Sequence, residues 1–515
     1  MTFAIRITAL SLALACGLLA EDPVTRDMSR KELRDRIAGG WAGQMIGVSF
    51  GAPTEFRSRG KINEGPLPPW TPDRVSNSLG QDDLYVDMTF AKVLDDKGLD
   101  ATSDDFGAMF RDAKYSLWHA NLAARRALKR GVPGSLSGTP KYNAHANDID
   151  FQIESDFIGL MTPGLHRSAT DIAMRAGRVM NYGDGLYGGV FVAGMYTAAF
   201  LEADPYKVVQ TGLASIPAKS PYGLLIADLL QWYKQNPNDW KKTWQLLEDK
   251  WDKNDPCPEG ALRPFNIDAK LNGAYIALGL LYGKKDFGKT IEIATRAGQD
   301  SDCNPASAGG ILGVMLGYNG IPEEYKGGIP ALADKKFEYT DFSFNTIVDS
   351  TEKRTLALIE KTGGKVDADR VTIKTQTPQP PKLEIWNYGT VAERVAADDK
   401  RWAFTGAWRP GTGKDTTKRA TDKGAEASID FNGTGAIVVG PYYVEGGKAD
   451  VYLDGRLDRT VDVASDERGG RSNESVWHVF GLKSGPHHIR VAVRGEAYGN
   501  SAGTTVGITD LVVFR

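Results

Sequence analysis

Hydrophobic positions follow two different periods, one before and one after about residue 360. Between residues 30 and 360, apolar residues recur every three or four positions, which is the period of an amphipathic helix. This pattern predicts helices at Asp104–Leu128, Ser168–Val179, Tyr222–Gln235 and Lys270–Leu281. Val190–Leu201 is apolar nearly all round, which is typical of a helix in the middle of a large bundle. We therefore expect an all-α domain over residues 30–360.

From about residue 385 onward, apolar and polar residues alternate with a period of two, which indicates β-strands. Turn signals such as Asn432-Gly433, Asp454-Gly455 and Ser484-Gly485 separate the alternating segments. The expected strands are Ala427–Phe431, Ala436–Val439, Ala449–Leu453, Ser475–Phe480, His488–Val493 and Gly507–Val513. Many short strands between turns predict a β-sandwich or jelly roll over residues 385–515.

The segment between these two blocks, residues 361–384, contains Gly363-Gly364 and the proline-rich run Thr375–Pro381. This composition predicts a linker with extended stretches. The expected fold class is therefore multidomain, with an all-α domain followed by a β domain.

The N-terminus has the pattern of an export signal. Residues 1–20 contain one charge, Arg6, followed by an apolar run that is shorter than the ~20 residues of a transmembrane helix. Cleavage after Ala20 would fit this pattern, and Cys16 is an alternative site of lipidation. No later segment is apolar enough to anchor the chain. We expect a secreted or periplasmic protein, with a lipid anchor at Cys16 as the alternative.

Composition removes several other classes of function. The chain has 62 Lys and Arg against 65 Asp and Glu, for a net charge of −3, and no basic block, so we expect no nucleic-acid partner. Three cysteines cannot form a disulfide framework, although Cys257 and Cys303 could pair in an oxidising compartment. The histidines have no His-Glu-x-x-His spacing, and neither a Gly-x-Ser-x-Gly elbow nor a Walker loop stands in its expected context.

Carboxylates lie beside glycines in four places of the helical block. The four clusters are Gly47–Glu55, Gly80–Asp87, Asn147–Asp156 and Gly298–Asn304. Aspartate at a helix start is an ordinary N-cap, which is one explanation of each cluster. The other is that carboxylate oxygens from separate segments hold a hard divalent cation such as Mg²⁺. Asp300 and Asp302 precede the small-residue helix expected at Pro305–Leu316, whose side chains allow neighbouring helices to approach closely.

Asp150 and Glu154 in the third cluster are separated by four residues, so we expect them to share one helix face. Their apolar neighbours Ile149, Phe151 and Ile153 leave little room for a freely solvated helix.

The order of these motifs resembles the ADP-ribosylglycohydrolase family over roughly residues 33–325. The chain has Gly47, Gly51 and Glu55, then Asp82-Asp83, then Gly298-x-Asp300-x-Asp302. Members of the family have Gly-Asp-x-x-Gly-x-x-x-Glu, Thr-Asp-Asp-Thr and Gly-Gly-Asp-Thr-Asp-Thr in this order. The resemblance implies an all-α fold with a two-magnesium centre that hydrolyses an N- or O-glycosidic bond to a ribofuranose.

Carried across by position, the resemblance implies that Asp82, Asp83, Asp300 and Asp302 are metal ligands. Glu55 would position or deprotonate the attacking water, so the implied catalytic residues are Glu55, Asp82, Asp83 and Asp300. The implied cofactor is Mg²⁺, as one or two ions, with Mn²⁺ or another divalent cation as the alternative. The chain departs from the family pattern at Val48, Gln81, Leu84, Ser301 and Cys303. A thiol is a softer ligand than a hydroxyl, so Cys303 makes the second metal position less suited to a hard cation such as Mg²⁺.

The third cluster and the segment Asn181–Gly189 look like the versions found in exported members of the family. The resemblance makes a set of side chains candidates for sugar binding: Asp148, Asp150, Glu154, Asp184 and Tyr187. The C-terminal block resembles a galactose-binding-like β-sandwich in Phe431–Pro441, Ala449–Gly455 and Leu482–Val491. Such modules either bind glycans through exposed aromatic side chains or only pack against their enzyme.

Three functions remain open at this point. The first is a secreted glycoside hydrolase that cleaves a furanosyl or related glycosidic bond in a polysaccharide or glycoconjugate with the assistance of a metal. The second is a hydrolase of ADP-ribosyl bonds. The third is a non-catalytic glycan-binding protein with a degenerate metal site. We expect the first, with a carbohydrate as the substrate.

Overall fold

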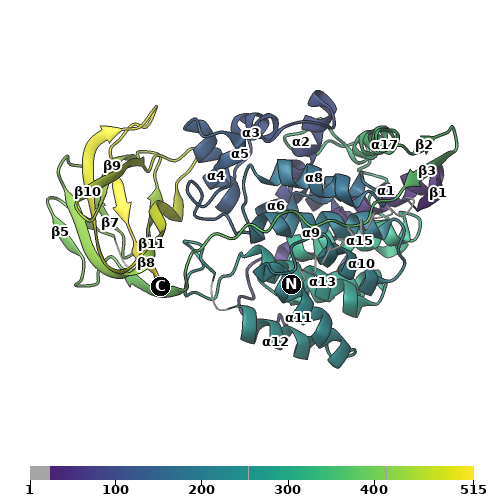
Figure 1. The fold of residues 1–515 in the computed structure, drawn as a ribbon, viewed down its shortest axis with the longest axis horizontal. Helices are drawn as coiled ribbons and strands as arrows, with labels where there is room; N and C mark the ends of the chain where they lie inside the picture. The colour runs from purple at the N-terminus through teal and green to yellow at the C-terminus, as the bar shows by residue number, and fades with distance from the viewer. Residues whose placement is uncertain (1–23, 253–254, 412–414) are drawn as a thin grey trace, which may run out of the picture.

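A helical unit and a β unit follow one another along the chain in the computed structural model, which confirms the expected order of α then β (Figure 1). The structure describes residues 24–252, 255–411 and 415–515. The expected export signal and Cys16 lie outside the described residues. None of the helices in the described residues combines the length and apolarity that a membrane crossing requires.

The helical unit is built from the helices of residues 30–361. Their bounds are α1 Arg30–Gly51, η1 Ala52–Thr54, η2 Pro72–Gly80, α2 Asp82–Lys97, α3 Ser103–Asp112, α4 His119–Lys129, α5 Gly134–Ser137, α6 Asp150–Ile153, α7 Asp156–Leu160, α8 His166–Gly177, α9 Asp184–Ala199, α10 Pro205–Ala214, α11 Pro221–Gln235, α12 Trp240–Trp251, α13 Ala269–Gly283, α14 Phe287–Arg296, α15 Cys303–Leu316, α16 Glu323–Lys326 and α17 Phe344–Lys361. Every residue of α9 is buried, as expected of the segment around Val190–Leu201.

The single helix expected over Asp104–Leu128 is wrong, because α3 ends at Asp112 and α4 begins at His119. Tyr115 and Leu117 in the connection are buried, so apolar residues reach the core across a break in the helix. The backbone of the connection is held from outside, since the Arg125 guanidinium donates to the Tyr115 carbonyl at 2.6 Å.

A row of glycines brings α1 into backbone contact with α15. Gly39, Gly43, Gly47 and Gly51 recur every four residues and therefore lie on one face of α1. A Cβ at Gly47 would overlap the Pro305 carbonyl, and one at Gly51 would lie 2.6 Å from the Cα of Asp302. This close approach places the turn that follows α1 directly beside the turn that opens α15.

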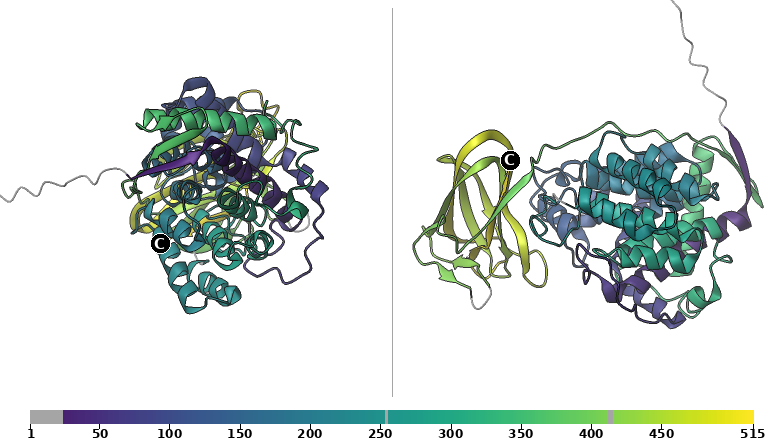
Figure 2. Two further views of the ribbon diagram at one scale, coloured as in Figure 1. Left: turned by 90° about the vertical axis from the view of Figure 1, so that its right-hand side faces the viewer. Right: turned by 90° about the horizontal axis from the view of Figure 1, so that it is seen from below.

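Part of the segment expected to be a linker belongs to a small antiparallel sheet. Strands β1 (Thr25–Ser29), β2 (Lys365–Val366) and β3 (Arg370–Lys374) have the order β1-β3-β2, and Asp27 pairs with Thr372. Beyond β3 the chain runs along the helical unit to the β unit, as Figure 2 shows. Hydrogen bonds from Ser168 to Gln376 and from Tyr187 to the Lys382 carbonyl hold this run in place.

The β unit contains a seven-stranded antiparallel sheet of order β10-β9-β11-β8-β13-β4, with β5 also pairing to β8, and a three-stranded sheet of order β12-β7-β6. The bounds are β4 Val391–Ala396, β5 Ala403–Thr405, β6 Arg409–Pro410, β7 Lys418–Ala420, β8 Glu426–Tyr442, β9 Gly447–Leu453, β10 Arg456–Asp462, β11 Arg471–Ala497, β12 Val506–Ile508 and β13 Asp510–Phe514.

Four of the expected strands merge into two long ones. Ala427–Phe431 and Ala436–Val439 are both parts of β8, while Ser475–Phe480 and His488–Val493 are both parts of β11. The expected turn at Asn432-Gly433 instead lies opposite Gly485-Pro486 inside the β8–β11 ladder, next to a shift in register. The two glycine-containing sites therefore mark a bend that the paired strands share, and neither of them is a turn between strands.

Candidate active site

A pocket of about 440 Å³ opens in the helical unit where several helix ends meet. Its walls come from the turn after α1, the starts of α2, α4 and α15, the short helix α6, and the loop between α12 and α13. A pocket of this size is within the usual range for small-molecule sites.

Carboxylate oxygens from two of these segments converge at the pocket. Glu55 follows α1, and Asp300 and Asp302 precede α15; one oxygen of each lies within 4.8 Å of the others. Asp300 and Asp302 are both 3% exposed, whereas Glu55 is exposed at the opening. These three side chains form an all-oxygen set, as a hard divalent cation requires.

A second set shares Asp302 with the first. Asp83, Asp302 and Cys303 also offer ligand atoms within 4.8 Å of one another. The Cys303 thiol donates to the Asp83 carboxylate at 3.4 Å. Asp82 lines the pocket beside this set but belongs to neither group of three among the described residues. The structure thus brings Glu55, Asp83, Asp300 and Asp302 together and places Asp82 next to them.

The turn before α15 has the conformation that this arrangement needs. Gly298 and Gln299 both have positive φ values, +89° and +53°. Gln299 is strained in that region, and its side chain is fixed by accepting from the Asn266 N–H and donating to the Pro264 carbonyl. The Phe56 N–H in turn donates to the Gln299 carbonyl at 3.0 Å, which joins the Glu55 turn to the Asp300 turn.

The carboxyl groups of the site hold their protons more strongly than usual. Desolvation and the negative charges of Asp302 and Asp82 raise the pKa of Glu55 to about 8. Burial and the charge of Asp302 raise the pKa of Asp82 to about 6 and the pKa of Asp83 well above its usual value. Within the part of the chain that the structure describes, one buried oxygen each of Asp83 and Asp300 has no hydrogen-bond partner. Like charges with unpartnered oxygens are the electrostatic environment that favours binding of a cation.

Asp150 and Glu154 both lie near the start of α4. The Asp150 carboxylate accepts from the backbone N–H groups of Ala120 at 3.2 Å and Asn121 at 2.9 Å. Glu154 accepts from the Asn121 side chain. Helix α6 ends at Ile153, so Glu154 stands just beyond the helix whose face it was expected to share. Asp150 and Asn121 line the pocket, whereas Glu154 lies behind Asn121.

The other three side chains expected to bind sugar do not line this pocket. Asp148 is fully buried and bonded to His145 at 2.7 Å. Asp184 accepts from the Tyr222 N–H at 3.2 Å at the start of α9. Tyr187 donates to the Lys382 carbonyl and so holds the run between the two units.

Several pocket residues have no signal in the sequence that would mark them. His119 has a left-handed backbone, with φ +43°, lies 3.6 Å from Glu259, and stacks on Phe265. Burial acts against protonation of His119, but the bond to Glu259 and the charge of Asp148 raise its pKa above the usual value. Trp118 is 45% exposed at the rim, beneath the Arg471 guanidinium of the β unit. Glu259 and Phe265 belong to a loop without periodicity, and only tertiary structure brings that loop to α4.

The fold and the site define a helical protein with acidic side chains gathered from separate segments at one pocket. The family model described as ADP-ribosylglycohydrolase matches residues 29–352, well over half of the chain, and the chain belongs to this family.

The chain is also similar to individual proteins. It is 27% identical over 143 residues to a protein of Flavonifractor plautii described as "A type blood alpha-D-galactosamine galactosaminidase". The match covers 27% of this chain but only 12% of that protein. Among solved structures, the "ADP-ribosylglycohydrolase-related protein complex" is matched over 63% of this chain and 98% of that chain, with 18% identity and a TM-score of 0.39. A "Carbohydrate-Binding Module CBM36 in complex with calcium and xylotriose" is matched over 24% of this chain and 100% of that chain, with 11% identity and a TM-score of 0.18.

Proposed function

We propose that this protein is an exported glycoside hydrolase that cleaves a furanosyl or related glycosidic bond in a polysaccharide or glycoconjugate, with the assistance of a divalent cation. The observation that supports this most directly is the convergence of Glu55, Asp300 and Asp302 on a pocket that also contains aromatic side chains. Membership of the ADP-ribosylglycohydrolase family supports glycosidic-bond hydrolysis as the reaction class.

The residues of the pocket fit a divalent cation. Glu55, Asp300 and Asp302 would hold one ion through oxygens alone, which suits Mg²⁺ or Mn²⁺. Asp83, Asp302 and Cys303 would hold a second ion less selectively, because a thiol favours softer metals. When bound, such a cation supplies Lewis-acid stabilisation of sugar oxygens and of the charge that develops as the bond breaks.

The protein's own side chains have distinct parts in this proposal. Glu55, exposed at the opening, orients the attacking water and accepts its proton; its ionised form is favoured when positive charge lies beside Asp302. Asp150 is locked by two backbone N–H groups and is therefore suited to hold a sugar hydroxyl in one position. Trp118, which is 45% exposed at the rim, offers a flat apolar surface against which a sugar ring can pack.

A plain glycoside fits the pocket better than an ADP-ribosyl group. Among the described residues that line the pocket, Arg59 is the single Lys or Arg, and it already lies 5.0 Å from the Phe265 ring centre and donates to the Phe56 carbonyl. A pyrophosphate is usually held by several cationic or N–H donors. The similarity to a protein described as a galactosaminidase and the export pattern of residues 1–20 support an extracellular glycan as the substrate.

The experiment is sugar release from a panel of furanosides, pyranosides and ADP-ribosyl conjugates, with Mg²⁺ or with a chelator. We expect release from a glycoside that stops when the metal is removed. Asp300→Asn and Asp302→Asn should each lower turnover by about 100-fold or more while circular dichroism stays unchanged. Asp96→Asn, at an exposed carboxylate near the end of α2, is the matched control and should keep the wild-type rate.

An undiminished rate in Asp300→Asn would overturn the assignment of the site. Release from ADP-ribosyl conjugates alone would replace the glycan with ADP-ribose as the substrate class. Sugar binding without turnover, unaffected by metal, would establish a glycan-binding protein with a degenerate centre.

A further inference from the structure

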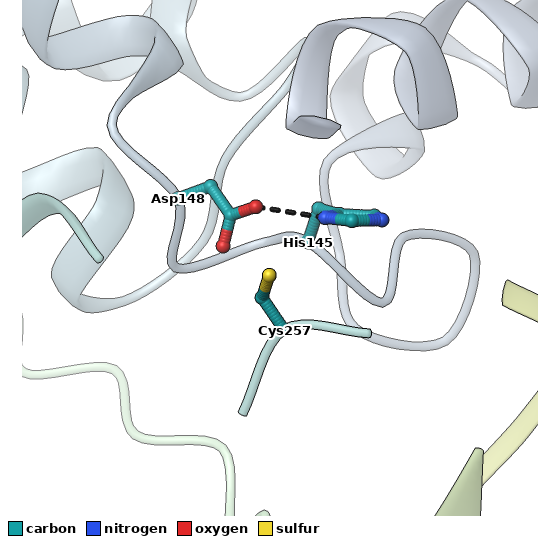
Figure 3. Close-up of side chains that lie close together, drawn as sticks. All are labelled: His145, Asp148 and Cys257. Carbon is teal, nitrogen blue, oxygen red and sulfur yellow. Dashed lines mark hydrogen bonds and ion pairs between the residues drawn. The ribbon is translucent and has the colours of Figure 1, made fainter. Parts of the chain in front are cut away.

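A buried cluster of three different metal-ligating side chains lies outside the pocket described above. His145 and Asp148 come from the loop after α5, and Cys257 comes from the loop between α12 and α13. One ligand atom of each lies within 4.8 Å of the others, and the three residues are at most 2% exposed. Figure 3 shows the Cys257 sulfur turned toward the Asp148 carboxylate, with His145 beside it.

The hydrogen bonds in the cluster leave one ligand atom free. His145 Nδ1 lies 2.7 Å from one Asp148 oxygen. The other Asp148 oxygen is buried and has no partner among the described residues. The Cys257 sulfur accepts a backbone N–H, from Gly260 at 3.3 Å. An unpartnered carboxylate oxygen beside a thiol is costly in a buried position unless a cation lies between them.

The far side of the imidazole faces a carboxylate, which is the kind of group that usually lies behind a metal-bound histidine. His145 Nε2 lies 3.5 Å from the Glu474 carboxylate, which comes from strand β11 of the β unit. A histidine that ligates a metal through one ring nitrogen typically donates its other N–H to a carboxylate, which fixes the ring. Glu474 is itself only 6% exposed.

We propose that His145, Asp148 and Cys257 form a second metal site, separate from the carboxylate cluster, that takes Zn²⁺ or a similar borderline-soft divalent ion. One nitrogen, one oxygen and one sulfur ligand suit zinc and not magnesium. The ionised thiol and carboxylate together contribute two negative charges, so a dication makes the buried cluster neutral. On binding, the metal displaces the proton between His145 and Asp148 and the proton of the Cys257 thiol, and both protons leave to solvent.

This site would position two walls of the pocket. Asp148 is followed directly by Ile149 and Asp150, and Cys257 is followed two residues later by Glu259, and all three of these neighbours line the pocket. The two loops already touch, since the Ile149 N–H donates to the Ile267 carbonyl at 2.9 Å. A metal bridging both loops, with Glu474 behind it, therefore joins the pocket to the β unit.

The test uses the full-length protein and metals alone, so it does not depend on the proposed activity. We expect zinc, measured by elemental analysis after dialysis against Mg²⁺, at about one equivalent per chain. Replacement by Co²⁺ should give a thiolate-to-cobalt charge-transfer band in the near ultraviolet. Cys257→Ser should abolish the band, while Cys303→Ser, which removes the thiol of the other cluster, should keep it.

His145→Ala is a second variant and should lower zinc retention at least tenfold. The wild-type protein alone can overturn the proposal, by retaining no zinc and giving no band with Co²⁺. A band lost in Cys303→Ser and kept in Cys257→Ser would also overturn it, because the thiolate ligand would then belong to the carboxylate cluster.

Discussion

Glu55 is an acid whose proton is bound more tightly in the folded chain than in the unfolded one. Its pKa rises from 4.5 to about 8 through desolvation and the charges of Asp302 and Asp82. Between these two values the metal-free folded state binds a proton that the unfolded state has released. The free energy of unfolding therefore falls as the pH rises through this range. The pKa values of Asp83 and Asp300 are raised as well and act in the same direction.

We therefore expect the chelated protein to be more stable near pH 5 than near pH 8, as the melting temperature in a chelator would show. Mg²⁺ competes with protons for the same oxygens, so its stabilising effect should be larger at pH 8. Asp300→Asn removes one of these carboxyl groups. In this variant, the difference in melting temperature between pH 5 and pH 8 and the pH dependence of the Mg²⁺ effect should both be smaller. A melting temperature that rises steadily from pH 5 to pH 8 without metal would contradict this account.

Most of the acidic residues at the pocket could be located from the sequence, because a short motif places them. The spacing Gly47, Gly51, Glu55 is the continuation of a glycine face, and Asp300 and Asp302 precede a small-residue helix. The wall of the pocket that contains Glu259 and His119 could not be located in this way. Glu259 and His119 are far apart in sequence and meet only through tertiary packing.

At the scale of elements, the contact of α1 with α15 determines where the two acidic turns meet. The backbones touch because four glycines of α1 lack a Cβ. A side chain there must displace backbone atoms, which cannot rotate away as a flexible side chain can. A side chain on this face of α1 should therefore disturb the geometry of the carboxylate site and also lower the free energy of unfolding.

Gly47→Ala should therefore lower the free energy of unfolding by about 1–3 kcal/mol and weaken Mg²⁺ binding, because a Cβ would overlap the Pro305 carbonyl. Gly40→Ala is the control on the same helix, since the atoms nearest to its Cβ would belong to the side chains of Leu160 and Val314 and not to backbone. Urea unfolding and metal titration of both variants measure the difference. Equal losses in the two variants would contradict a special role for the backbone contact.

The elements themselves could be predicted where periodicity and turn residues agree. The helices α8, α11 and α13 begin and end within two residues of their expected bounds, whereas α9 begins six residues before the expected Val190–Leu201. The break between α3 and α4 could not be predicted, because the connection also contains buried apolar residues, Tyr115 and Leu117, without forming a helix. Similarly, glycine is a residue type that favours turns, yet Gly433 and Gly485 lie opposite each other within the paired strands β8 and β11.

At the scale of the molecule, the β unit packs against the helix that forms one wall of the pocket. Arg126 of α4 pairs with Asp462 at 3.1 Å and Asp466 at 3.0 Å, and its guanidinium lies 3.7 Å from the centre of the Tyr442 ring. On the other wall, Arg394 donates to the carbonyls of Pro258 and Ala261. The β unit thus holds both walls from behind, whether or not it also binds glycan.

Arg126→Ala should lower the free energy of unfolding by ~2 kcal/mol, because it removes two largely buried ion pairs and the packing on the Tyr442 ring, while Arg130 still pairs with both carboxylates. It should also raise KM more than it lowers kcat, since α4 carries Asn121 and Trp118 precedes it. Arg401→Ala breaks two largely exposed ion pairs of the same unit, with Glu393 and Asp399, and should cost less than ~1 kcal/mol. Calorimetry and steady-state kinetics would check both variants. A decrease in the free energy of unfolding in Arg126→Ala as small as that in Arg401→Ala would contradict the role of the β unit in holding α4.

The pairing of β1 with β3 has a consequence for the order in which the chain folds. Asp27 lies opposite Thr372, so β1 has its partner strand 345 residues later in the chain. Until that partner emerges, the N–H and C=O groups of β1 must be satisfied by water or by some other strand. The helical unit can be closed only when nearly all of it has left the ribosome, and β1 is exposed to mispairing for that whole interval.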